Sequence, residues 1–219
     1  MINICKYLQH NKSSLINEYL LSKNSKQNNR KKITANDKNL RQIVLDEMDK
    51  HGDDADLNQI DVSNVTDMSS LFANTNFCGD VSDWNVSNVL VMNSTFYGCS
   101  EFNCDLSGWD TSHVINMTGM FYECRSFNCD LSRWDVSEVI FMNDMFEWCE
   151  NFNCDISKWD VSKVNGMRSM FHGCKKFNQD LSKWNVSKVT AYDHIFAICP
   201  IEKKYKPSFK KIIYLESTI

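Results

Sequence analysis

Residues 110–134 read DTSHVINMTGMFYECRSFNCDLSRW, and residues 135–159 read DVSEVIFMNDMFEWCENFNCDISKW. The two stretches share their Met, Phe, Cys, Asp and Trp positions at a constant step of 25 residues. Further copies of the same text occupy 61–84, 85–109, 160–184 and, in shortened form, 185–199. Self-similarity over such a period is typical of proteins built from tandem copies of one supersecondary unit. We therefore interpret residues 61–199 as a repeat array.

Three ladders of identical residues run through the copies. They are Trp84, Trp109, Trp134, Trp159 and Trp184; Cys99, Cys124, Cys149, Cys174 and Cys199; and Asp105, Asp130, Asp155 and Asp180. We expect the tryptophans and cysteines to be structural and the cysteines to be buried as small hydrophobic groups. Each Asp is expected to accept backbone hydrogen bonds in a turn. A cation-binding groove along the Asp ladder is the alternative.

Two periodicities alternate within a copy. Val114, Met117 and Phe121 follow steps of three and four, which predicts an amphipathic helical segment of two or three turns. Residues 130–136 then alternate with period two, as a short strand would. The predicted fold class is therefore an α/β repeat solenoid of the leucine-rich-repeat type. It would have five full 25-residue coils, one partial coil and an N-terminal capping helix.

The array is predicted to have extensions on both sides. Residues 1–36 are interpreted as an N-terminal extension with a basic linker, and 37–60 as a cap helix with its connection. The helix is placed over Asn39–Lys50, with Asp37 available as its start signal. Residues 200–219 are interpreted as a C-terminal tail or cap.

The repeat unit resembles that of the BspA-like leucine-rich-repeat surface proteins of mycoplasmas, other bacteria, protists and large DNA viruses. Trp134–Phe152 (WDVSEVIFMNDMFEWCENF) shows the likeness best, and the likeness covers about 140 of the 219 residues. The resemblance implies a fold and says little about function. Bacterial relatives often carry a signal peptide or wall anchor, which is not visible here, and small residues where this chain has Cys.

The ten cysteines invite a metal-binding interpretation, because three copies contain a Cys-x4-Cys pair. Structural zinc sites favour shorter spacings and a closed set of four ligands. We therefore expect no metal and no cofactor. Reduced thiols are the favoured state, and disulfides between neighbouring copies are the alternative.

Composition bounds the class of protein. A hydrophobic fraction of 42% predicts a folded chain, and a net charge of -4 gives no reason to expect a nucleic-acid partner. We expect no membrane span, because no apolar run approaches roughly 18 residues. The absence of a visible signal peptide predicts an intracellular protein, with an exported or surface protein as the alternative.

Function is predicted from what varies between copies. The three histidines of the array occupy unrelated repeat positions, and there is no phosphate loop or nucleophile elbow, so we expect no enzyme. The residue before each Trp varies and forms a candidate binding column of Asp83, Arg133, Lys158 and Lys183. We expect a protein-binding scaffold with an unknown protein partner. The alternatives are a self-associating, coat-type structural protein and an extracellular adhesin.

Overall fold

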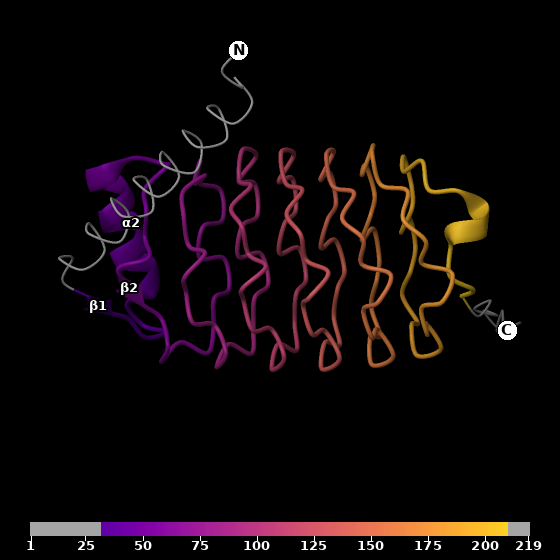
Figure 1. Ribbon diagram of the computed structural model, residues 1–219, viewed down its shortest axis with the longest axis horizontal. Helices are drawn as coiled ribbons and strands as arrows, with labels where there is room; N and C mark the ends of the chain where they lie inside the picture. Colours follow the sequence, from indigo (N-terminus) through magenta and orange to yellow (C-terminus); the bar gives the residue numbers. More distant parts are fainter. Residues whose placement is uncertain (1–31, 210–219) are drawn as a thin grey trace, which may run out of the picture. The chain divides into compact units, whose positions relative to one another are not determined.

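The computed structural model describes residues 32–209, which contain little regular secondary structure (Figure 1). Their regular elements are the helix α2 (Leu40–His51), the strands β1 (Ile33–Thr34) and β2 (Ile60–Asp61), which form a two-stranded sheet, and the 3-10 turn η1 (Lys203–Tyr205). Thr34–Ile219 forms one compact unit. Most of the predicted N-terminal extension and half of the predicted tail lie outside the described residues. Within residues 32–209 no helix is long and apolar enough to cross a bilayer.

The predicted α/β solenoid of leucine-rich-repeat type is wrong. Between β2 and η1 the described chain contains neither a helix nor a multi-residue strand, so no copy has the predicted helix-plus-strand unit. Consecutive turns take the place of both, over the predicted helical stretch from Val114 to Cys124 and over the predicted strand at 130–136.

The hydrogen bonds explain why the apolar stripe does not form a helix. An α-helix needs each N–H to bond to the carbonyl four residues earlier. Here the N–H groups of Met120, Tyr122 and Cys124 bond to carbonyls three residues earlier, at 3.0–3.2 Å. The N–H groups of Phe121 and Glu123 leave the copy altogether and bond to the following copy at 3.0 and 2.8 Å. Successive turns of three residues place apolar groups at nearly the same steps as a helix, so the pattern alone does not separate them.

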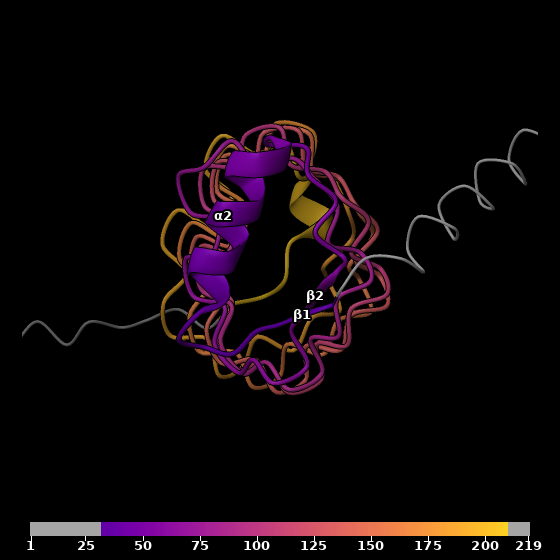
Figure 2. The ribbon, with the colours of Figure 1, turned by 90° about the vertical axis from the view of Figure 1, so that its left-hand side faces the viewer.

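Neighbouring copies are joined by single parallel bridges and not by paired strands of several residues. Parallel bridges join Val91 to Asn116, Asn116 to Phe141, Phe141 to Gly166 and Gly166 to Ala191. Each bridge advances the chain by 25 residues, so the copies lie side by side in sequence order (Figure 1). In the view turned by 90° the copies overlap and have similar closed outlines (Figure 2).

Aromatic rings fill the space inside these outlines. Phe96, Phe121, Phe146 and Phe171 stack in a row with centroids 5.6–5.8 Å apart. The Trp ladder is buried, and each indole N–H donates to a backbone carbonyl 27 or 28 residues earlier, as Trp134 does to Leu106 O at 2.9 Å. Within residues 32–209 every buried side-chain nitrogen and oxygen has a hydrogen-bond partner. Buried polar groups without partners are costly, so this pairing is what allows a core assembled from turns.

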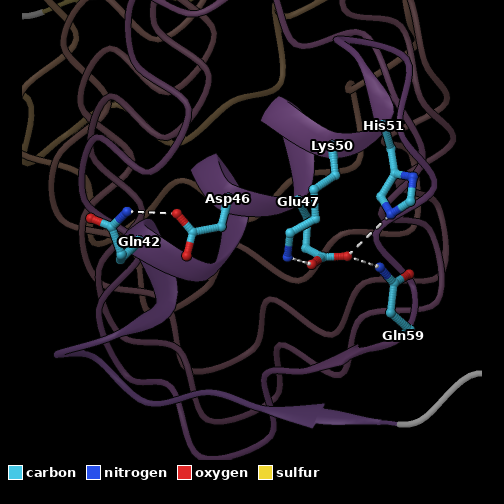
Figure 3. A network of polar contacts seen from close by, with 6 residues as sticks. All are labelled: Gln42, Asp46, Glu47, Lys50, His51 and Gln59. Carbon is cyan, nitrogen blue, oxygen red and sulfur yellow. Dashed lines mark hydrogen bonds and ion pairs between the residues drawn. The ribbon is translucent and has the colours of Figure 1, made fainter.

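Helix α2 lies at the N-terminal end of the copies (Figure 2), within one residue of the predicted segment Asn39–Lys50. It buries Leu40, Val44 and Met48 in the common core. Its one buried charge, Glu47, accepts hydrogen bonds from Lys50 at 2.8 Å and Gln59 at 3.1 Å (Figure 3). Both bonds lower the pKa of Glu47, and the bond from Lys50 has the larger effect. The Glu47 carboxylate therefore stays ionised.

Asp37 does not cap α2 as predicted. Asn39 occupies the N-cap position without a side-chain capping bond. The Asp37 carboxylate instead accepts the backbone N–H of Thr66 at 2.7 Å and the Thr66 hydroxyl at 2.8 Å. A residue expected to start the helix therefore binds the first copy.

Candidate functional site

A donor ladder holds the outer surface of the copies in register. We use this name for the alternate N–H groups that donate to the following copy, such as Met117, Gly119, Phe121 and Glu123. Their donor–acceptor distances are 2.8–3.0 Å. Because every copy before the last repeats the pattern, side chains at equivalent positions project from neighbouring points on one backbone frame.

An exposed row of apolar side chains runs across three copies where the bridges form. This aliphatic line consists of Leu90, Ile115, Ile140 and Phe141. The N–H of Ile115 donates to Leu90 O at 2.8 Å and that of Ile140 to Ile115 O at 2.8 Å, so the three aliphatic residues are direct neighbours. Their side chains and that of Phe141 are 37–42% exposed, and they are four of the five exposed large hydrophobic residues in the described chain. Such clustering makes the line a candidate interaction surface, whereas single exposed residues are ordinary.

A second group, the aromatic line, lies a few residues later in four consecutive copies and consists of Tyr97, Tyr122, Trp148 and His172. Trp148 lies one position after Glu147, the residue equivalent to the tyrosines and His172. The two tyrosine rings stack with centroids 4.5 Å apart, and the Trp148 and His172 rings lie 5.0 Å apart. Gly173 makes room for the indole, because a Cβ there would lie 2.4 Å from the ring. Trp148 has φ of 60°, a left-handed conformation that is costly for a bulky residue and orients its ring.

An ionisable pair lies within the aromatic line. His172 Nδ1 is 2.8 Å from Glu147 Oε1, and both side chains are largely buried. Desolvation raises the pKa of Glu147, although the hydrogen bond with His172 acts in the opposite direction. Burial and the neighbouring Glu147 charge raise the pKa of Tyr122 to about 12. The pair holds the imidazole against Trp148 and completes a partly buried polar patch.

Charged pairs occur at other outer positions. Lys163 and Glu138, in neighbouring copies, are 2.6 Å apart. Glu150 lies between Lys175 at 2.8 Å and Arg125 at 3.5 Å, and the bond from Lys175 lowers the pKa of Glu150. Exposed pairs of this kind contribute little to stability, but polar groups around an apolar patch are typical of protein interfaces.

The predicted binding column is exposed but not strongly basic. Asp83, Arg133, Lys158 and Lys183 are all exposed. Each of the three basic residues lies near the Asp three positions before it, and its charge helps to lower the pKa of that Asp. The basic charge is thus offset locally, which weakens the field that the column presents.

The Asp ladder forms turns in the way that the sequence suggests. Asp105, Asp130, Asp155 and Asp180 each accept the backbone N–H of the Ser two residues later, at 2.9–3.0 Å. This is the geometry of an Asx-turn. Within the described residues no group of three or more His, Cys, Asp or Glu could hold a metal ion.

The Cys ladder is buried apart from Cys199, which is half-buried. Each thiol of the ladder donates to a backbone carbonyl of an earlier copy, as Cys149 does to Phe121 O at 2.9 Å. Desolvation raises the pKa of Cys149 well above its ordinary value. The nine cysteines in the described range are free thiols. This arrangement is that of structural, unreactive cysteines.

The aliphatic line was missed at the level of sequence. The prediction concentrated on the residue before each Trp and assigned the line to the start of a helix. A signal exists, because the residue after the Val at the fifth position of each copy is apolar in Leu90, Ile115 and Ile140 and polar in Asn165 and Thr190. Variation between apolar and polar within one exposed column is the pattern that could have identified it.

Comparison with known proteins gives a family without an assigned function. The model of the family described as "Mycoplasma protein of unknown function, DUF285" matches residues 38–147 and 130–201. No curated protein and no solved structure matches the chain.

Proposed function

We propose, from the premise that this chain belongs to the DUF285 family of Mycoplasma proteins of unknown function, that it is a non-catalytic protein-binding scaffold. The observation that carries the proposal is the aliphatic line, in which Leu90, Ile115, Ile140 and Phe141 are exposed together. Protein interfaces combine an apolar centre with a polar rim, and the line has polar and charged columns beside it. Its partner is a protein with a complementary apolar strip.

Rigidity favours this use of the surface. The backbone under the line is bonded to both neighbouring copies, since Ile115 donates its N–H to one copy and Met117 donates to the other. Side chains that are already held in place lose less conformational entropy on binding than side chains on a loop. Tyr97, Tyr122 and Trp148 of the aromatic line belong to the residue types that dominate binding energy at interfaces.

The test compares two positions of one column. Ile115→Asp places a carboxylate in the middle of the aliphatic line, and Asn165→Asp places one at the equivalent exposed position two copies later. Burying the exposed part of one Ile contributes about 1 kcal/mol, and burying an unpaired carboxylate adds a cost. We expect Ile115→Asp to weaken the affinity for a captured partner by more than about tenfold. Asn165→Asp should change this affinity by less than about twofold.

The readout is the dissociation constant of partners captured by the wild-type chain, titrated against both variants. Equal affinity of such partners for wild type and Ile115→Asp would show that the line is not the binding surface. The column of Asp83, Arg133, Lys158 and Lys183 stays a prediction of a second contact. Reversing the charge of its three basic residues should then weaken binding of the same partner. Unchanged affinity would show that the column is not part of the binding surface.

The relationship to BspA-like surface proteins also stays a prediction, resting on the repeat text alone. Self-association remains the rival proposal. Head-to-tail stacking is opposed by α2, because its side chains already occupy the N-terminal end of the copies. Sedimentation of the wild-type chain at rising concentration tests this rival, which requires a mass that grows with concentration.

A further inference from the structure

The two ends of the stacked copies are treated differently. Between copies, the N–H groups of Leu90 and Val91 donate to Thr66 O at 2.8 and 3.3 Å. The equivalent N–H groups of the first copy, on Thr66 and Asp67, have no copy before them and donate to the Asp37 carboxylate at 2.7 and 3.2 Å. A carboxylate here takes the place of a missing backbone carbonyl.

Arg41 completes this closure from the first turn of α2. In the second copy the carbonyl of Thr95 accepts the N–H of Phe72, which belongs to the first copy. The equivalent carbonyl of the first copy, Leu71 O, accepts a hydrogen bond from the Arg41 guanidinium at 2.8 Å, and Arg41 also bonds to Ser70 O. Side chains therefore satisfy the two N–H donors and the Leu71 carbonyl of the N-terminal edge, and α2 packs over the same end of the core. Together they close this edge to a further chain.

At the C-terminal end, Phe209 stacks on Tyr192 with ring centroids 4.5 Å apart, but the described chain leaves a row of backbone N–H groups without acceptors. The N–H groups of Ser169, Phe171 and Gly173 donate to the last copy at 2.9 Å each. In that last copy the equivalent groups are the N–H of His194, Phe196 and Ile198, and within residues 32–209 none of them has a hydrogen-bond acceptor. Ile198 is also the most exposed large hydrophobic residue in this range, at 63%. We call these three residues the donor edge.

The donor edge determines the kind of partner that fits. The carbonyls of Asp193, Ile195 and Ala197 point back to the preceding copy, so the edge offers a row of donors. Two donor edges cannot pair with each other, and the N-terminal edge of a second chain is closed by Asp37 and Arg41. The partner must therefore bring acceptors at every second residue, as an extended peptide segment does.

The charge near the donor edge favours an acidic segment. Residues 185–206 contain four lysines against Asp193 and Glu202, and Glu202 is already paired with Lys204 at 2.9 Å. The Lys206 ammonium lies 5.3 Å from the centre of the Phe196 ring and so stands beside the edge. Opposite charge strengthens and orients such an encounter.

We propose that the donor edge binds an extended, acidic segment of another protein, whose backbone carbonyls and carboxylates accept the N–H groups of His194, Phe196 and Ile198. The site lies at the end of the copies and does not depend on the aliphatic line. The two proposals can therefore fail separately.

The probe is a synthetic peptide copied from the chain itself. Residues 141–149 (FMNDMFEWC) supply the carbonyls of Asn143, Met145 and Glu147, which accept the N–H groups of Gly119, Phe121 and Glu123. The peptide carries Asp144 and Glu147, and Ser replaces its Cys149 to prevent oxidation. A control peptide carries Asp144→Asn and Glu147→Gln, which removes the charge at nearly constant shape.

The measurement is amide hydrogen exchange of the full chain, resolved by residue. We expect His194, Phe196 and Ile198 to exchange rapidly in the free chain and at least about tenfold more slowly with saturating acidic peptide. The neutral peptide should bind at least about threefold more weakly than the acidic peptide. Lys206→Glu should weaken binding of the acidic peptide similarly, and Lys38→Glu, at an exposed position before the first copy, should leave its affinity unchanged.

Three results would overturn the proposal. The first is binding of the acidic peptide without protection of the three amides. The second is protection of these amides in the free chain, which would show that the edge is already occupied. The third is equal affinity of the acidic and neutral peptides together with no effect of Lys206→Glu, since the charge argument would then be wrong.

Discussion

Asp37 is expected to stabilise the whole array, although it lies outside the helix and is exposed. Replacing it by Ala removes hydrogen bonds from Thr66 N–H, Thr66 Oγ1 and Asp67 N–H, of lengths 2.7, 2.8 and 3.2 Å. A hydrogen bond to a charged group contributes about 1.5–3 kcal/mol where water is excluded. Water replaces much of each bond here, because Asp37 and Thr66 are both exposed. The expected loss is about 1–2 kcal/mol in total, comparable to removal of a helix N-cap.

Urea unfolding followed by tryptophan fluorescence measures this loss. The matched control is Asp49→Ala, which removes an exposed carboxylate from α2 and should change the free energy of unfolding by less than about 0.5 kcal/mol. With a urea dependence of about 2 kcal/mol per molar, Asp37→Ala should lower the midpoint by about 0.5–1 M. Equal midpoints for the two variants would refute the role assigned to Asp37 at the N-terminal edge.

The pH dependence provides an independent check on the same group. The hydrogen bond from the Thr66 N–H is the main cause that lowers the pKa of Asp37 below its ordinary value of 3.8. A carboxyl group whose pKa is lower in the folded state stabilises fully above its unfolded pKa and loses that contribution as pH falls through the folded pKa. The stability difference between wild type and Asp37→Asn should therefore be constant near pH 6 and shrink below about pH 4. A difference that persists unchanged at pH 2 would contradict this assignment.

Three further predictions concern the copies themselves. Glu123 has φ of 57°, a conformation that Gly adopts more easily, so Glu123→Gly should raise the free energy of unfolding by about 0.5 kcal/mol. Gly173→Ala should lower the free energy of unfolding by at least about 1 kcal/mol, because the new Cβ would meet the Trp148 ring. Trp134→Phe removes a buried hydrogen bond to Leu106 O, which keeps only the N–H of Trp109 as its donor, and chemical denaturation should show a loss of about 1–2 kcal/mol. Among the nine cysteines of residues 32–209, a thiol reagent should modify the exposed Cys78 first, while Cys149, whose burial raises its pKa, should react only on unfolding. Early modification of Cys149 would argue against a buried ladder.

Part of this structure could be predicted from the sequence because it depends on short-range rules. The stripe of Leu40, Val44 and Met48 is helical in α2, where no outside partner competes for the backbone. The Asx-turns of Asp130 and its equivalents follow from an Asp two residues before a Ser. Both features need only neighbours in sequence.

The fold of a copy could not be predicted in the same way, because its hydrogen bonds reach the next copy. Phe121 and Glu123 donate 24 residues ahead, and this competition replaces an expected helix by turns. The left-handed conformations that make this possible occur at Gly119 but also at Glu123 and Trp148, residue types that give no warning. The aliphatic line was missed for the same reason, since its exposure depends on where those turns place the bridges.

The most direct test of this account is a nuclear magnetic resonance measurement of couplings across hydrogen bonds, which identifies the acceptor of each amide. For Phe121 the account predicts a coupling from its amide nitrogen to the carbonyl carbon of Met145, the acceptor at 3.0 Å in the next copy. A coupling from Phe121 to Met117 instead would mean that the segment is an α-helix. The turn-built stack, and with it the aliphatic line and the donor edge, would then be wrong.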